Sequence, residues 1–150
     1  MQATKILKSE HQAMRRLMTE VACSGETGRK ALFLLFKREL ELHDAMETRV
    51  FYPAISANRR TCGLAGMDTE ARRVVAKALK SLESMPIGAK DWLPYFRAIK
   101  GILLRHMDDE EFGALDSVEK ALSVGELEVL GIQLAYERQR MIVGSLAPVS

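Results

Sequence analysis

The sequence has little of what marks secreted or membrane-spanning proteins. It contains two cysteines and no CxxC spacing, which argues against a zinc ribbon or a disulfide scaffold and fits a reducing compartment. Its longest apolar run extends only from Ala31 to Phe36, whereas a membrane span needs about 20 residues. Residues 1–10 lack the apolar core of a signal peptide. We therefore expect a cytoplasmic protein with no membrane partner.

Neither sign of charge dominates the chain. Its 22 basic and 20 acidic residues give a net charge of +2, and they are interleaved and form no basic stripe. Aromatic residues make up 6% of the chain, so few rings are available to stack on bases, and we expect no nucleic-acid partner. With 47% hydrophobic and 28% charged residues, the composition is that of an ordinary globular protein. The length predicts a single domain over residues 1–150.

Proline and glycine are few and lie between long segments in which apolar residues recur at helical spacing. Helices are predicted at about residues 4–22, 27–55, 69–84, 91–122 and 124–141. Asp68 is a predicted N-cap, and Ser123 with Glu126 forms a predicted capping box for the last helix. The fold class is therefore all-α. We predict an up-down-up-down four-helix bundle over about residues 4–122, with the C-terminal helix packed outside it or against a partner.

All three histidines lie on the apolar sides of these helices. His43 and His106 are each followed four residues later by a glutamate, Glu47 and Glu110, a spacing that puts imidazole and carboxylate on one helix face about 6 Å apart. At a rise of about 1.5 Å per residue, these groups and His11 lie at similar depth in the bundle. Burying them together without a cation would leave costly unpaired groups. We predict that these five residues bind a metal, and imidazole with carboxylate suits iron, zinc or manganese. The alternative is hydrogen-bonded core histidines and ordinary ion pairs.

The order of these motifs resembles the hemerythrin-like family, the HHE cation-binding domains, over about residues 5–112. Members carry an early histidine, an HxxxE motif followed by an aromatic residue and proline, a Glu-His pair on the third helix and a second HxxxE motif, around a non-haem di-iron centre. This sequence is similar at His11, at His43 and Glu47 with Tyr52-Pro53 following, and at His106 and Glu110. The resemblance implies an iron protein that binds or senses dioxygen, nitric oxide, peroxide or iron itself.

One helix departs from the family pattern. Glu70-Ala71 stands where the family has Glu-His, and Ala71 lies on the inward stripe, so an open coordination position is expected beside it. Three outcomes follow: one metal ion, two ions with Tyr52, Glu70 or solvent at the vacant position, or a site that no longer binds metal. Tyr52 lies nine residues after His43 and points away from it on an ideal helix, unless Pro53 unwinds that turn.

Acidic residues adjoin the predicted ligands. Glu39, one turn before His43, is the candidate to hydrogen-bond that imidazole and fix its tautomer. The remaining acidic residues near the motifs are expected to form a solvated rim: Asp44, Asp108, Asp109 and Glu111.

The sequence identifies no catalytic residue and no organic cofactor site. Turnover of peroxide or nitric oxide stays open beside simple binding, because no separate general base can be recognised. The alternative function is a helical adaptor or regulatory module with a degenerate, metal-free site. It would act through the apolar stripe of the last helix, Leu127, Leu130 and Leu134, which could also form a homodimer.

Overall fold

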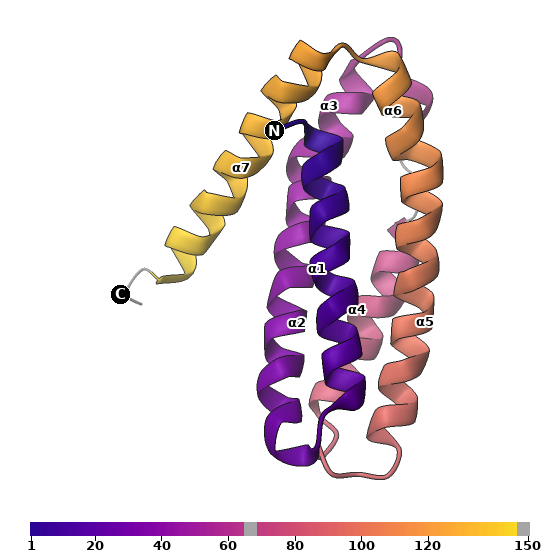
Figure 1. Ribbon diagram of the computed structural model, residues 1–150, viewed down its shortest axis with the longest axis vertical. Coiled ribbons are helices and arrows are strands. Elements are labelled where there is room, and N and C mark those ends of the chain that lie inside the picture. The colour runs from indigo at the N-terminus through magenta and orange to yellow at the C-terminus, as the bar shows by residue number, and fades with distance from the viewer. Residues whose placement is uncertain (65–68, 147–150) are drawn as a thin grey trace.

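The computed structural model describes residues 1–64 and 69–146 of the chain, and within these ranges the regular structure is helical with no strand. Four long helices lie side by side in alternating directions (Figure 1): α1 (Ala3–Cys23), α2 (Glu26–Met46), α4 (Thr69–Glu83) and α5 (Trp92–Glu110). The chain between and after them forms five short elements, η1 (Glu47–Phe51), α3 (Tyr52–Ala57), η2 (Cys62–Leu64), η3 (Glu111–Leu115) and α6 (Asp116–Ala121), and a fifth long helix, α7 (Val124–Leu146). The predicted all-α bundle with an additional C-terminal helix is confirmed.

The predicted helix ranges agree with the structure within two residues, except that the last helix continues to Leu146 and does not end near Met141. The second and fourth predicted helices each contain a π-helical segment, η1 and η3, which divides α2 from α3 and α5 from α6. The predicted capping box is confirmed: the Ser123 amide donates to Glu126 Oε2 over 2.7 Å and the Glu126 amide donates to Ser123 Oγ over 3.1 Å. The predicted cap Asp68 lies outside the described residues.

Two apolar clusters fill the bundle, one toward each end. Along α1, Leu7 belongs to one cluster and Met14 to the other, and His11 lies between them. Along α5, Met107 belongs to the second cluster and is followed by the buried Glu110. A polar layer therefore crosses the core between the two apolar clusters.

Helix α7 packs beside the start of α1 and then extends away from the bundle (Figure 1). Its stripe of Leu127, Leu130 and Leu134 is buried in the apolar cluster that also contains Ala3 and Leu7 of α1. Gly131 allows the close approach, because a Cβ at this position would lie 2.0 Å from the backbone oxygen of Met1. Of the two placements expected for the last helix, the structure shows packing against this chain's own bundle, which covers the leucine stripe that the alternative function would use.

None of the helices described combines the length and the apolar composition that crossing a bilayer requires.

Candidate metal centre

The glutamates of both HxxxE motifs lie where an α-helix meets a π-helical segment. Glu47 is the first residue of η1, and its carbonyl accepts from the amide of Tyr52, five residues later. Pro53 explains the wider turn, because proline has no amide proton and its ring clashes with the carbonyl four residues earlier in an α-helix. Glu110 is the last residue of α5, directly before η3. Single π-helical turns of this kind are frequent at functional sites.

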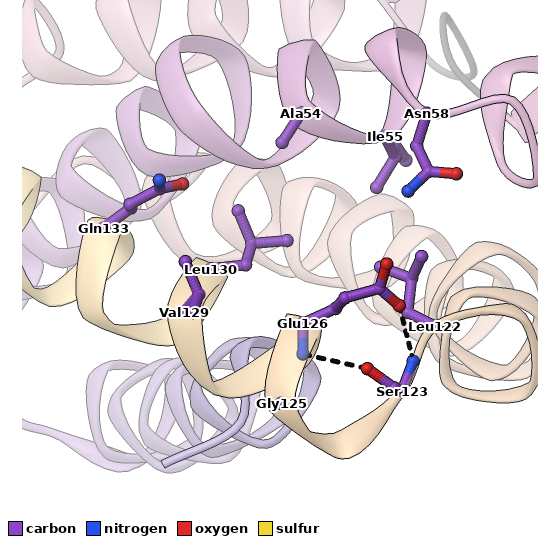
Figure 2. Close-up of a pocket in the computed structure, with 10 residues that line it drawn as sticks. All are labelled: Ala54, Ile55, Asn58, Leu122, Ser123, Gly125, Glu126, Val129, Leu130 and Gln133. Atoms are coloured by element: carbon purple, nitrogen blue, oxygen red, sulfur yellow. Dashed lines mark hydrogen bonds between the residues drawn. The ribbon is translucent and has the colours of Figure 1, made fainter.

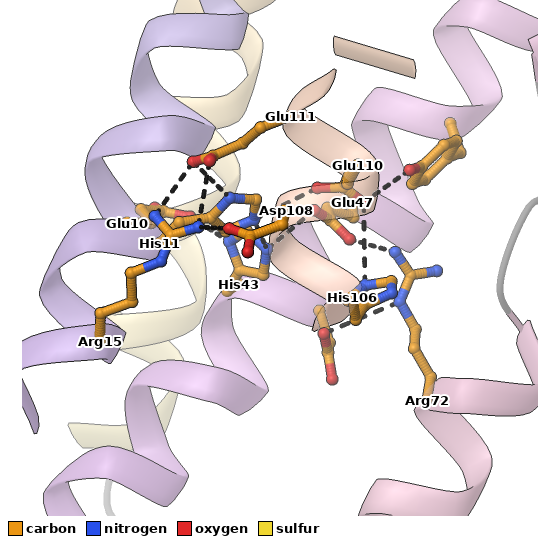
Figure 3. Close-up of polar contacts among 12 residues, drawn as sticks. Glu10, His11, Arg15, His43, Glu47, Arg72, His106, Asp108, Glu110 and Glu111 are labelled. Atoms are coloured by element: carbon orange, nitrogen blue, oxygen red, sulfur yellow. Dashed lines mark hydrogen bonds and ion pairs between the residues drawn. The ribbon is translucent and has the colours of Figure 1, made fainter. Parts of the chain in front are cut away.

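Four of the predicted ligands meet in the polar layer: His11 from α1, His43 from α2, Glu47 from η1 and Glu110 from α5. One ligand atom from each lies within 4.8 Å of the others, and all four residues are buried. His43 Nε2 lies 2.8 Å from Glu47 Oε1, and His11 Nε2 lies 3.2 Å from both Glu110 Oε1 and His43 Nε2. We call these four residues the His/Glu cluster (Figure 3).

The outer nitrogens of the two imidazoles fix where their protons lie. His11 Nδ1 is 3.1 Å from Glu111 Oε1, and His43 Nδ1 is 2.8 Å from Glu10 Oε1. An ionised carboxylate only accepts, so each Nδ1 donates and each neutral imidazole turns an Nε2 lone pair to the centre. Both glutamate Oε1 atoms of the cluster are buried without a hydrogen-bond partner in the described chain. Two nitrogen and two oxygen acceptors therefore converge, which is costly unless a cation or proton joins them.

These four acceptors fit a divalent ion of the first transition row. Metal–nitrogen and metal–oxygen bonds are about 2.0–2.2 Å, so atoms within 4.8 Å of one another need little movement to share one ion. Imidazole and carboxylate together are suited to iron, zinc and manganese. The donor set is thus complete for one ion without Tyr52, Glu70 or His106.

Arginines hold the two carboxylates that orient the imidazoles. Arg15 Nη2 lies 3.0 Å from Glu111 Oε2, and it also pairs with Asp108 at 2.9 Å. Arg138, from α7, lies 3.6 Å from Glu10 Oε2. Such outer partners fix the ring orientation of ligand histidines and raise their basicity. The additional helix therefore reaches the supporting layer of the centre.

Two expectations about these carboxylates were wrong. Glu39 is not the partner of His43; it accepts from Arg138 at 2.9 Å, and Glu10 of the neighbouring α1 contacts the imidazole instead. Glu111 faces His11 and not solvent. Glu10 and Glu111 each contact an imidazole from a different helix. In the sequence, each is marked only by its position next to a predicted ligand, His11 or Glu110.

The protonation state of each cluster residue depends on the charges of its neighbours. Burial alone would lower the pKa of the His43 imidazole, but the carboxylates of Glu47 and Glu10 hold it well above its usual range. Burial would raise the pKa of Glu47, but His43 and Arg72 hold it well below its usual range. Burial and the adjacent Glu47 raise the pKa of Glu110. Without metal, these shifts favour a proton on His43 beside an ionised Glu47.

On the α4 side, Tyr52 lies near the cluster. Its hydroxyl donates to Glu110 Oε2 over 2.7 Å, and burial together with Glu110 raises the pKa of the phenol, which keeps it protonated. An ideal helix would point Tyr52 away, and the structure shows the alternative, a turn unwound before Pro53: the π-helical segment η1 changes the angular position of every residue after it. Glu70 is exposed and pairs with Arg73 on the surface of α4.

Arg72 was not predicted as a site residue, yet it reaches the centre. Its guanidinium pairs with Glu47 Oε2, lies 3.7 Å from Asp44 Oδ1 and is 5.2 Å from the Tyr52 ring centroid. Asp44 lies at the solvated edge with its side chain 34% exposed, and partial burial raises its pKa to about 6. In the sequence, Arg72 and Arg73 look like two surface residues. The packing of α4 in the bundle turns Arg72 inward and leaves Arg73 exposed.

His106 lies at the edge of the centre. Its Nε2 is 3.9 Å from Glu110 Oε2, and it lies outside the group of four ligand atoms. With Asp44, Ala71 and Arg72 it lines a cavity of about 10 Å³, which has room for about one water molecule. The gap expected beside Ala71 is therefore small, because the guanidinium of the next residue adjoins it.

A buried His/Glu cluster held between the long helices of a bundle defines a class of protein, the helical cation-binding bundles. The sequence matches the family model described as hemerythrin HHE cation binding domain over residues 2–116. The chain belongs to this family, as its motifs indicated.

A solved structure supports the same assignment. A hemerythrin HHE cation binding domain-containing protein from Mycobacterium kansasii is similar to this chain with a TM-score of 0.80 and 25% sequence identity. The similarity covers 97% of this chain and 90% of that chain. No match was found among curated proteins.

Proposed function

We propose that the protein binds iron at the His/Glu cluster and through it binds or senses dioxygen, nitric oxide, peroxide or iron itself. The observation that carries the proposal is the convergence of four buried acceptor atoms, two of which lack a hydrogen-bond partner among the described residues. Iron suits this mixture of imidazole and carboxylate, and zinc or manganese would also be accepted.

The residues of the chain have separable roles. His11, His43, Glu47 and Glu110 would hold the ion, and Glu10 and Glu111 would orient the imidazoles. Iron held there would supply a change of oxidation state and affinity for a small ligand. The Tyr52 hydroxyl donates its proton to Glu110 Oε2, with 2.7 Å between the two oxygens. The apolar clusters on both sides of the layer exclude bulk water.

The space at the centre favours a small ligand. Two cavities adjoin His106, one of which also adjoins His43, and each is about 10 Å³. The larger hollows lie elsewhere, and one of about 580 Å³ lies between α3 and α7 (Figure 2). A diatomic molecule or peroxide is therefore the class of partner that we propose, and an organic substrate is not.

We favour binding over turnover. Among the residues described, the ionisable groups that contact the cluster serve as ligands or as partners of ligands, which leaves no separate general base. The same proposal places the protein in the cytoplasm, where a reducing environment suits the exposed free thiols of Cys23 and Cys62.

The test is anaerobic addition of ferrous iron to the purified chain, followed by elemental analysis and by optical spectra before and after exposure to air or nitric oxide. At neutral pH, where the ligands can release their protons, we expect about one iron or more per chain and a new absorption band after exposure. Fewer than about 0.2 ions per chain would contradict the proposal.

A second candidate is a helical adaptor or homodimer that acts through α7 with no metal bound. The observation that favours it is an exposed apolar face on α7, formed by Val129, Ile132 and Tyr136. Sedimentation of the wild-type chain and of Ile132→Glu tests it. A dimer that the variant abolishes, in a protein that takes up no metal, would support this candidate over the first.

A further inference from the structure

We infer that Arg72 is a built-in cation that limits the centre to one metal ion. The inference rests on the proposed function, because it concerns how many ions the His/Glu cluster and its surroundings accept.

Each glutamate of the cluster turns its two oxygens to different surroundings. Glu47 Oε1 lies 2.8 Å from His43 Nε2, while its Oε2 pairs with the Arg72 guanidinium. Glu110 Oε1 lies 3.2 Å from His11 Nε2, while its Oε2 accepts from Tyr52. The carboxylates therefore divide the centre into two halves.

The two halves differ in what they contain. The imidazole half consists of the Nε2 atoms of His11 and His43 and the two Oε1 atoms, and it holds no permanent positive charge. The arginine half contains the two Oε2 atoms with Tyr52, His106 and Asp44 around them, and Arg72 already supplies its positive charge. Figure 3 shows the arginine side chain entering this half from α4.

The guanidinium is fixed there. It contacts carboxylates of Glu47 and Asp44, lies over the Tyr52 ring, and the Arg72 side chain is only 15% exposed. An arginine keeps its charge at every accessible pH. A divalent ion in the arginine half would therefore lie beside a permanent cation in a poorly screened interior, where repulsion is strong.

Space leads to the same conclusion. The cavity lined by Ala71, Arg72 and His106 is about 10 Å³, close to the minimum for one water molecule. The small side chain of Ala71 supplies no ligand, and the neighbouring arginine supplies a charge where a ligand would stand. With a single ion in the imidazole half and Arg72 in the other half, the carboxylates of both halves face one cation each.

The experiment is the ferrous iron content of the whole chain at saturation under anaerobic conditions, with circular dichroism to verify folding. We expect one ion per chain in wild type, and two in Arg72→Ala and in Arg72→Gln, which removes the charge while keeping a hydrogen-bond donor. Arg72→Lys retains a charge and Arg73→Ala changes only an exposed neighbour, so both should stay at one ion. The glutamine variant is the informative one if the alanine variant does not fold.

The outcomes separate the two proposals. Two ions in the wild-type chain would overturn the inference while the proposed function stands, and this result needs no variant. One ion in wild type and still one in folded Arg72→Gln or Arg72→Ala would also overturn it. Negligible iron in wild type and in every variant would overturn the proposed function and the inference with it.

Discussion

The Nε2 atoms of His11 and His43 lie 3.2 Å apart inside the bundle. Each imidazole already donates from Nδ1, to Glu111 and Glu10 respectively, so two neutral rings would bring two lone pairs into contact. A proton on His43 relieves this contact in the metal-free protein, and a metal ion relieves it in the loaded protein. Protons and metal therefore compete for the same position.

This competition predicts that metal binding is pH-dependent. The carboxylates beside His43 hold its pKa well above the usual range, so loading must displace a proton even at neutral pH. We expect affinity for ferrous iron to rise between pH 6 and 8, with protons released on binding. Anaerobic calorimetry in two buffers of different ionisation enthalpy measures the release. Equal heats in both buffers together with a flat affinity would contradict this assignment.

The raised pKa of His43 also predicts how the stability of the metal-free protein changes with pH. A basic group with a raised pKa in the folded state stabilises that state at a pH below its unfolded pKa, about 6.5, and this contribution is lost as pH rises through the folded value. Urea unfolding between pH 6 and 9.5 should show the contribution of His43 declining, and His43→Gln should remove that decline. A wild-type curve parallel to that of the variant would refute the linkage.

The supporting carboxylates should affect affinity through the imidazoles. Glu10→Gln removes the ionised acceptor that lies 2.8 Å from His43 Nδ1, and losses of this kind are typically about 10- to 100-fold in metal affinity. Glu41→Gln is a matched control, because Glu41 is exposed on α2. Competition against a chelator measures both. Equal affinity in the two variants would mean that Glu10 does not orient the ligand.

Not every predicted ligand should matter equally. His43→Ala removes one of the four convergent atoms and should abolish binding, whereas Glu70→Gln changes an exposed residue and should leave iron content unchanged. His106→Ala should retain one ion, because His106 lies outside the group of four. Elemental analysis of the three folded variants distinguishes them. Loss of iron in Glu70→Gln would show that α4 supplies a ligand.

Substitution of Gly131 tests the close packing of α7 against the N-terminal residues. A Cβ at Gly131 would meet the Met1 backbone oxygen at 2.0 Å, so Gly131→Ala should destabilise the fold by about 1–3 kcal/mol, as overpacking does. Gly101, exposed in α5 with nothing within 4 Å, is the control: Gly101→Ala should stabilise by about 0.5–1 kcal/mol through helix propensity. Urea denaturation measures both changes, and a Gly131→Ala variant as stable as wild type would show that the close approach does not exist.

Much of the fold could be predicted because the relevant signals are local. Apolar periodicity and the positions of proline and glycine gave helix ranges that agree with the structure, and Ser123 with Glu126 gave the start of α7. The convergence of His11, His43, Glu47 and Glu110 followed from spacing and depth along straight helices. Each of these depends only on neighbours within a few residues or on the constant rise of a helix.

What the sequence did not predict depends on contacts between helices. Tyr52 turns inward because η1 is π-helical, and an ideal helix gives the wrong angle after that turn. Glu10 and Arg72 contact the centre from helices other than those of their partners, His43 and Glu47. Periodicity identifies the buried face of one helix but not the residue that faces it from another.

The most direct test of a cation held by the His/Glu cluster is diffraction at the iron absorption edge from crystals loaded anaerobically with ferrous iron. We predict one anomalous peak between His11 Nε2, His43 Nε2, Glu47 Oε1 and Glu110 Oε1. Crystals that contain no iron, or iron bound only on the surface away from these four atoms, would contradict it.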